Sequence, residues 1–148
     1  MKPQETVDYH IKLAWHSIVN LYNQLAVEHE LTQATGFVLL NIGDNGGTPA
    51  TKIAPLMGMK KTSLSRMLKN MEDEGLICRI KDEQDGRQVN ICLTEEGQKK
   101  KKVAKQVVKQ FNEHILSNID AEHLSCFYQV MQDINGLTED YRNKKIKS

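Results

Sequence analysis

Residues 60–94 read KKTSLSRMLKNMEDEGLICRIKDEQDGRQVNICLT, and the period of their hydrophobic residues changes once, at Gly75. Before that glycine the apolar residues recur every three or four positions, which is the spacing of an amphipathic helix. After it, apolar and polar residues alternate in two runs, 77–81 and 89–93, on either side of a polar turn. The stretch therefore predicts a helix over 61–74, ended by Gly75, and then a β-hairpin with its tip at 82–88.

The predicted helix has a second face, which is polar and carries no acidic residue before Glu72. That face consists of Lys61, Thr62, Ser65, Arg66 and Lys69. An α-helix fits the major groove of B-DNA, where short polar side chains reach the edges of the bases. A hairpin tip lies along the DNA backbone or enters the minor groove. A cationic helix followed at once by a basic hairpin tip thus predicts a surface that binds double-stranded DNA.

The candidate DNA-binding residues all come from this helix and hairpin. They are Lys60, Lys61, Thr62, Ser63, Ser65, Arg66, Lys69, Arg79, Gln84, Asp85, Gly86, Arg87 and Gln88. Arg66 is suited to a bidentate contact with guanine, and Arg87 to a narrow A·T-rich minor groove. We expect Asp85 to hold Arg87 or Arg79 by a charge-assisted hydrogen bond and so to shape the tip. Each lysine taken alone is best explained as a solvated helix surface, so the prediction depends on the cluster and the hairpin together.

The same stretch resembles the MarR (multiple antibiotic resistance regulator) family. Asp85-Gly86-Arg87, followed by ICLTEEG at 91–97, is similar to the wing signature of that family, D-x-R followed by L-x-L-T-x-x-G. A similar helix-turn-helix pattern precedes it, carried by Ile53-Ala54, Leu56, Ser63-Leu64-Ser65, Leu68, Met71 and the run from Glu74 to Arg79. Pro55 departs from the family pattern, because a proline inside a helix removes a hydrogen bond and favours a kink.

This resemblance extends over essentially the whole chain. It implies a fold that is mainly α with a small two- or three-stranded β-wing, made of a winged helix-turn-helix core plus a helical dimerisation region. It also implies a homodimeric transcriptional regulator that binds an inverted-repeat operator, with repression as the common mode. The residues themselves do not distinguish repression from activation.

The segments outside residues 60–94 are predicted to be helical. A helix over 5–29 carries a heptad-like apolar seam, which fits either a partner subunit or an ordinary core, and the resemblance favours a dimer interface. Shorter helices are predicted over about 33–43, capped by Thr32, and from Thr48 to about Met57, with Thr48 as the N-cap.

Two long helices are predicted to begin at Thr94 and Asp120. We therefore expect the winged helix-turn-helix DNA-binding domain in residues 31–97 and the dimerisation region in residues 1–30 and 98–148.

The composition is that of a globular protein, with a formal net charge of only +1 over 148 residues. The clustering of cations in residues 60–87, more than the net charge, therefore creates the field that a DNA backbone would experience. No stretch approaches the roughly 20 apolar residues that span a bilayer. The first ten residues also lack the apolar region of a signal peptide, so we expect a cytoplasmic protein without a membrane partner.

The three cysteines show neither zinc-ligand spacing nor a disulfide framework. Pairing Lys81 with Val89 across the hairpin places Cys78 opposite Cys92. Two small strand residues in a reducing compartment are the simpler interpretation, and a thiol switch is the alternative. No sensing cysteine precedes Cys78, which argues against the peroxide-sensing subclass of the family.

A small-molecule effector is expected between the dimerisation helices and the DNA-binding core, as in the family. The candidate lining residues are Trp15, His16, Val19, Tyr22, Met57, Met59 and Met71. Aromatic and methionine side chains suit an adaptable apolar pocket for an apolar or aromatic anionic effector, although each is more often a core residue.

Enzymatic motifs do not appear in the sequence. There is no Gly-rich phosphate loop and no H-E-x-x-H or G-x-S-x-G motif, and the five histidines are scattered. We therefore expect neither an enzyme nor a cofactor or metal requirement. A protein-interaction module that uses the long terminal helices is the remaining rival function.

Overall fold

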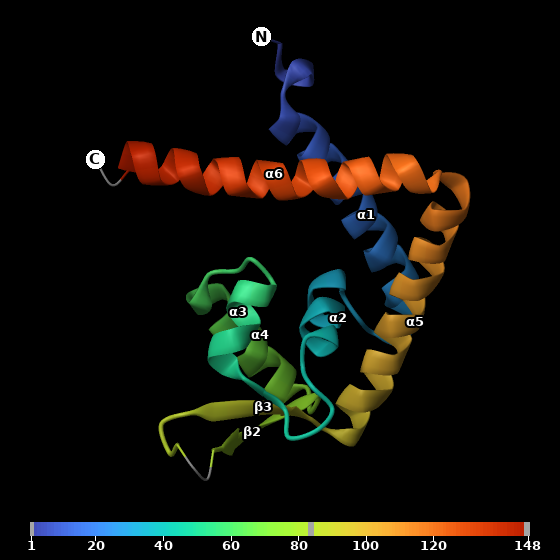
Figure 1. The fold of residues 1–148 in the computed structure, drawn as a ribbon. Helices are drawn as coiled ribbons and strands as arrows, with labels where there is room; N and C mark the ends of the chain where they lie inside the picture. The colour runs from blue at the N-terminus through green and yellow to red at the C-terminus, as the bar shows by residue number, and fades with distance from the viewer. Residues whose placement is uncertain (1, 83–84, 147–148) are drawn as a thin grey trace. The chain divides into compact units, whose positions relative to one another are not determined.

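The computed structural model describes residues 2–82 and 85–146, which form a mainly helical protein with one small sheet (Figure 1). The helices are α1 (Val7–Ala26), α2 (Gln33–Leu40), α3 (Ala50–Leu56), α4 (Lys61–Asp73), α5 (Glu95–Asn118) and α6 (Ala121–Ile146). Two short 3-10 turns, η1 (Pro3–Glu5) and η2 (Val27–His29), flank α1. The strands are β1 (Thr48–Pro49), β2 (Ile77–Lys81) and β3 (Val89–Leu93). The predicted fold class is confirmed, and the sheet has three strands.

The chain divides into two compact units, residues 1–108 and 109–148. The first contains α1 to α4, the sheet and the first part of α5. The second contains the rest of α5 and all of α6. These two units are defined by which residues pack together. The predicted division into a DNA-binding domain and a dimerisation region is defined by function, and it stays a prediction.

Hydroxyl side chains fix the starts of the first two helices. Thr6 Oγ1 accepts a hydrogen bond from the backbone N–H three residues on, at the start of α1, and Thr32 Oγ1 does the same for α2. The predicted cap at Thr32 is therefore confirmed. The helix predicted over 5–29 ends as an α-helix at Ala26, and after η2 the chain turns at Glu30, whose φ is 53°.

The start of α3 corrects a prediction. Thr48 is not an N-cap, because α3 begins at Ala50 with Pro49 as its N-cap and without a side-chain capping bond. Thr48 lies in β1 opposite Ile91 of β3, and its Oγ1 accepts a hydrogen bond from the Gly43 N–H at 2.8 Å. Threonine followed by proline suits an edge strand as well as a helix start, and pairing with β3 decides between them.

The end of α3 agrees with its prediction. α3 contains Pro55 and stops at Leu56, with Met57 as its C-cap and Gly58 at a φ of 61°. The left-handed backbone at Gly58 favours glycine and stops the helix.

The hydrophobic core of the first unit joins α2, α3, α4 and the sheet, which lie together in Figure 1. Its largest fully buried side chains are Val38, Leu39, Ile42, Ile53, Met71 and Ile91. Burying one such side chain contributes about 1.5–3 kcal/mol. This core fixes which face of α4 turns inward and therefore which face remains for a partner.

The sheet has the order β1-β3-β2 and is antiparallel throughout. Lys81 pairs with Val89 and Cys78 with Cys92, so the predicted hairpin register is confirmed. Because β3 is the central strand, its buried Ile91 anchors the hairpin to the helical core.

Thr94 joins the hairpin to both neighbouring helices. Its hydroxyl donates a hydrogen bond to the Gly75 carbonyl oxygen (2.6 Å) and accepts one from the Gly97 N–H (3.0 Å) in the first turn of α5. Its own N–H donates to the Leu76 carbonyl oxygen (3.1 Å). Gly97 sits so close to the Leu76 carbonyl that a Cβ would not fit. One residue thus ties the end of α4, the base of the hairpin and the start of α5.

The second unit is helical, and Asp120 caps α6 as predicted, by accepting a hydrogen bond from the His123 N–H at 2.9 Å. None of the residues that the structure describes in α6 is buried. In the described part of the chain, no helix combines the length and the apolar character that a membrane span requires.

Candidate nucleic-acid interface

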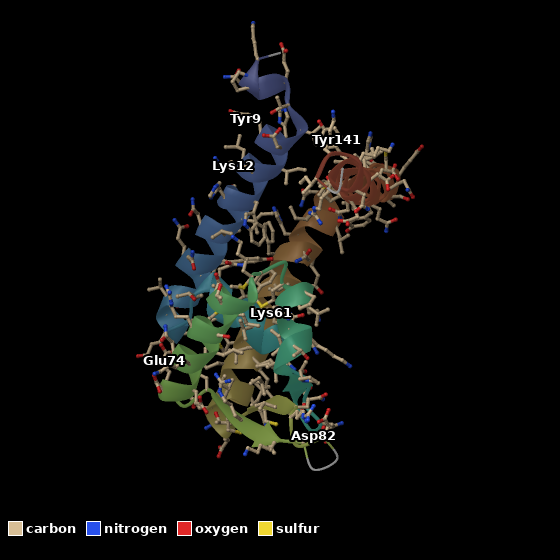
Figure 2. The ribbon with its side chains drawn as sticks, turned by 90° about the vertical axis from the view of Figure 1, so that its left-hand side faces the viewer. Tyr9, Lys12, Lys61, Glu74, Asp82 and Tyr141 are labelled. Carbon is tan, nitrogen blue, oxygen red and sulfur yellow. The ribbon has the colours of Figure 1, made fainter. Side chains whose placement is uncertain are left out.

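The two faces of α4 differ sharply in burial. Leu64, Leu68 and Met71 are between 1% and 3% exposed and pack into the core. The candidate residues of the other face are all exposed, namely Lys61, Thr62, Ser63, Ser65, Arg66 and Lys69. Figure 2 shows α4 with Lys61 near its beginning and Glu74 just past its end. The core therefore presents one continuous cationic and hydroxyl-bearing surface to solvent.

The beginning of α4 is favourable to an anion. Lys60 is its N-cap, no side chain caps it, and its first turn contains no acidic residue. The free backbone N–H groups and the helix dipole give this end a partial positive charge, to which Lys60 and Lys61 add. A phosphate group would be stabilised here by both contributions.

Arg79 lies on β2 beside α4 rather than in the hairpin tip. Its Nε atom is 3.0 Å from Glu72 Oε2 of α4, and both side chains remain more than one third exposed. Arg79 also borders a shallow groove of about 140 Å³ between α3 and α4, together with Lys61, Ser65 and Thr51. The ion pair corrects one expectation, because the described partner of Arg79 is Glu72 and not Asp85.

The hairpin tip, which we call the wing, is shaped by hydrogen bonds of its backbone N–H groups. Asp85 Oδ1 accepts a hydrogen bond from the backbone N–H of Arg87 at 3.1 Å, and the Gln88 N–H donates to the Asp85 carbonyl oxygen at 2.8 Å. The Asp82 N–H closes the base by donating to the Gln88 carbonyl oxygen at 2.9 Å, and Figure 2 locates Asp82 there.

Asp85 thus shapes the wing as expected, but through the backbone of Arg87 and not through its guanidinium. Among the described residues, the exposed Arg87 side chain has no ion-pair partner. Gly86 is also exposed, Gln88 is half-buried, and Gln84 lies outside the described residues.

Two residues of the lysine run at 99–102 make contacts with distant parts of the chain that the sequence did not reveal. Lys101 Nζ donates to the Ile42 carbonyl oxygen (2.6 Å) and contacts Asp44 Oδ1 (2.7 Å). Lys100 Nζ donates to the His29 carbonyl oxygen and lies 3.5 Å from Glu30 Oε2. Both lysine side chains are only 16% exposed. They therefore fasten α5 to the ends of η2 and α2.

The Lys101 ammonium also changes the acidity of its partner. Its hydrogen bond to Asp44, and then its charge, hold the pKa of that carboxyl below the ordinary value of 3.8. Asp44 is solvent-exposed, so this ion pair contributes little to the free energy of unfolding.

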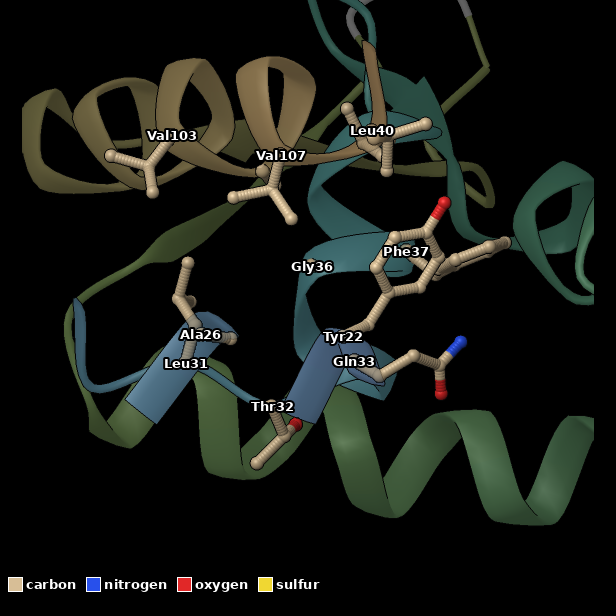
Figure 3. A pocket seen from close by; sticks show the side chains of 12 residues that line it. Tyr22, Ala26, Leu31, Thr32, Gln33, Gly36, Phe37, Leu40, Val103 and Val107 are labelled. Carbon is tan, nitrogen blue, oxygen red and sulfur yellow. The ribbon is translucent and has the colours of Figure 1, made fainter. Parts of the chain in front are cut away.

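A small apolar cavity lies between α1, α2 and α5 within the first unit. It holds about 30 Å³ and is bordered by Tyr22, Ala26, Leu31, Thr32, Gln33, Gly36, Phe37, Leu40, Val103, Ala104, Val107 and Val108. In Figure 3, Val103 and Val107 of α5 face Ala26 and Leu31 across it. This volume holds about one water molecule, whereas pockets for drug-sized ligands measure about 300–1,000 Å³.

Of the seven residues predicted to contact an effector, Tyr22 borders this cavity. Trp15 is exposed and packs edge-on against Phe37, with ring centroids 6.0 Å apart, and His16 is exposed. Val19, Met57 and Met59 are half-buried. Met71 is a core residue, 1% exposed. The cavity residues of α2 and α5 were missed because the apolar pattern of one helix does not identify its neighbours.

Comparison with known proteins agrees with this geometry. The sequence model of the MarR family matches residues 31–89. The chain is 28% identical over 129 residues to the HTH-type transcriptional regulator SarZ of Staphylococcus aureus (strain USA300), covering 86% of this chain and 85% of SarZ. It is 33% identical over 84 residues to the HTH-type transcriptional regulator TtmR of Methylorubrum extorquens (strain PA1), covering 57% of this chain and 43% of TtmR.

A solved structure supports the fold. The S. aureus MepR–DNA complex superposes with a TM-score of 0.81 and 22% identity, covering 88% of this chain and 97% of MepR. The three-stranded sheet and the α3–α4 pair define a winged helix-turn-helix protein. Over residues 31–89 the chain matches the MarR family, and the curated relatives it resembles are HTH-type transcriptional regulators.

Proposed function

We propose that two copies of this chain bind an inverted-repeat DNA operator, with α4 in the major groove and the wing in or beside the minor groove. The observation that carries this proposal is the division of α4, whose apolar stripe is buried while its cationic and hydroxyl-bearing face is exposed. Arg87 in the wing is exposed as well. Arg66 and the hydroxyl residues Thr62, Ser63 and Ser65 read base edges, and Lys60, Lys69 and Arg79 contact phosphates. Two recognition helices on successive major grooves require half-sites about one helical turn apart.

The dimer is supported by apolar side chains that the chain leaves exposed. α6 exposes Phe127, Tyr128, Val130, Leu137, Tyr141 and Ile146, and α1 exposes Val7, Ile11, Leu13, Trp15 and Leu25. Exposed apolar surface on this scale is characteristic of protein–protein interfaces. We therefore assign residues 1–30 and 98–148 to dimerisation and residues 31–97 to DNA binding.

The proposed mode of action is repression that an apolar or aromatic effector relieves. An effector changes DNA affinity only if it binds the two conformations unequally. The cavity between α1, α2 and α5 supports this proposal. It holds only about 30 Å³, so an effector molecule fits there only if those helices move apart. Among the described residues that border it, none is cationic, so an anionic group of the effector would have to extend beyond this lining.

The proposal places the protein in the cytoplasm, where a regulator meets DNA, and assigns it no catalytic activity. Similarity to a family of transcriptional regulators supports both statements.

Replacing Arg87 by Ala tests the DNA-binding surface. A dimer carries two wings, and a loss of about 1 kcal/mol at each weakens operator binding about 30-fold. Lys12→Ala is the matched control, because it removes one exposed positive charge from α1, away from α4 and the wing. Gel-shift titrations should show weaker binding for Arg87→Ala and for Arg66→Ala, with the Lys12→Ala protein close to the wild type. Equal affinity for all four proteins would contradict the proposed placement.

A further inference from the structure

Two cysteines face each other at the base of the wing. Cys78 of β2 and Cys92 of β3 are direct partners in the antiparallel register, one pair away from Ile77 and Leu93 at the end of the ladder. Directly paired residues project from the same side of a sheet, so both thiols lie on one face. Both residues are half-buried.

The spacing of this pair is suitable for a disulfide. Directly opposed residues of an antiparallel ladder have Cα atoms about 4.5 or 5.5 Å apart, depending on the type of pair. Disulfides form at Cα separations of about 4.4–6.8 Å, so neither type requires the strands to separate or to change register.

The Cys92 thiol packs against the loop between α2 and β1. Its Sγ atom lies 3.6 Å from the Gly46 carbonyl oxygen, and a Cβ at Gly47 would be 2.6 Å from it. Burial, followed by the charge and hydrogen bonding of Cys78, raises the pKa of the Cys92 thiol. Cys92 is therefore held beneath the α2–β1 loop with Cys78 as its sulfur neighbour.

We propose that Cys78 and Cys92 are a reversible modification site, which a low-molecular-weight disulfide such as oxidised glutathione converts into an intrachain disulfide. The thiolate of Cys78 attacks one sulfur of the small disulfide, forms a mixed disulfide and releases one small thiolate. The deprotonated Cys92 sulfur then attacks the Cys78 sulfur, forms the protein disulfide and expels the second small thiolate. The two protons lost by the cysteines go to these thiolates, so two protein thiols are oxidised while one small disulfide is reduced to two thiols.

Cys78 is the first nucleophile in this sequence because burial, followed by the neighbouring Cys78, raises the pKa of the Cys92 thiol and so disfavours its thiolate. The product closes a loop of about 15 residues that includes the wing. Since the closure leaves the register unchanged, it holds the two strands together without moving α4. The modification thus stiffens the wing base and stabilises the folded chain, with an expected rise in Tm of about 5–10 °C.

The test uses the full-length Cys126→Ser protein, which keeps only the facing pair. It is equilibrated without denaturant in glutathione buffers of increasing oxidised fraction and is then acid-quenched. We expect a mass loss of about 2 Da that a dithiol reductant reverses. Tryptic digestion without reduction should join NMEDEGLICR, residues 70–79, to QVNICLTEEGQK, residues 88–99.

Two matched variants identify the site. Adding Cys78→Ser or Cys92→Ser to the Cys126→Ser protein should abolish the 2-Da loss and leave at most a glutathione adduct. Circular dichroism establishes that each variant is folded before oxidation. Free thiols at every glutathione ratio in the folded protein, or a disulfide that forms only in denaturant, would overturn the proposal. Digestion of the oxidised wild type supplies a second check, since a link to Cys126 instead of the predicted peptide pair would also overturn it.

Discussion

Replacing Thr94 by Ala tests the junction between the DNA-binding surface and α5. The substitution removes the hydroxyl that caps α5 at Gly97 and that donates to the Gly75 carbonyl oxygen. Loss of an N-cap costs about 1 kcal/mol, and loss of a neutral hydrogen bond costs about another 1 kcal/mol. We therefore expect the free energy of unfolding per chain to fall by about 2 kcal/mol, which corresponds to a decrease in Tm of about 4–8 °C.

Thr94→Ser is the matched control because serine keeps the hydroxyl and loses only a methyl group. Urea denaturation of both variants and the wild type, at one protein concentration, gives the required differences. Wild-type stability in the Thr94→Ala protein would refute the assigned role of the hydroxyl. A Thr94→Ser protein as unstable as Thr94→Ala would also refute this role, because the loss of stability would then be due to the methyl group and not to the hydroxyl.

Three further predictions concern the contacts of Lys101 with Ile42 and Asp44, and the exposed apolar residues of α6. Lys101→Met should lower the free energy of unfolding by about 1–2 kcal/mol in urea titrations, because the Ile42 carbonyl loses a charged donor in a mostly buried position. Asp44 has a lowered pKa, so its ionised form stabilises the fold above pH 3.8 and this contribution is lost as the pH falls below that value. Asp44→Asn should therefore make Tm less dependent on pH below 3.8, and an unchanged acid profile would contradict the ion pair. Leu137→Asp should yield single subunits in light-scattering measurements while Gln132→Asp remains dimeric, and two dimeric variants would contradict an interface on α6.

The hairpin and the recognition helix could be predicted because their signals are local. The period changes at Gly75, and pairing the two alternating runs from Lys81 and Val89 places Cys78 opposite Cys92, as the structure does. The inward stripe of α4 follows from helical spacing for the same reason.

The errors and omissions concern partners that are distant in the sequence. Thr48 has the chemistry of a helix cap, but it pairs with Ile91, which a local pattern does not reveal. Lys100 and Lys101 belong to a run that circles a helix, and they are fixed by backbone carbonyls 71 and 59 positions away. The border of the small cavity likewise depends on how α1, α2 and α5 pack, so aromatic content in α1 alone identified Tyr22 but not the valines of α5.

Selection of bound sequences from a random pool of duplex DNA tests the central claim most directly. The proposed geometry predicts an enriched inverted repeat with half-site centres about 10 bp apart, occupied by one dimer. Affinity for the selected site should fall steeply with salt, because binding releases counterions from the phosphates. The absence of any enriched sequence, or binding of a lone subunit to a single half-site, would contradict the account.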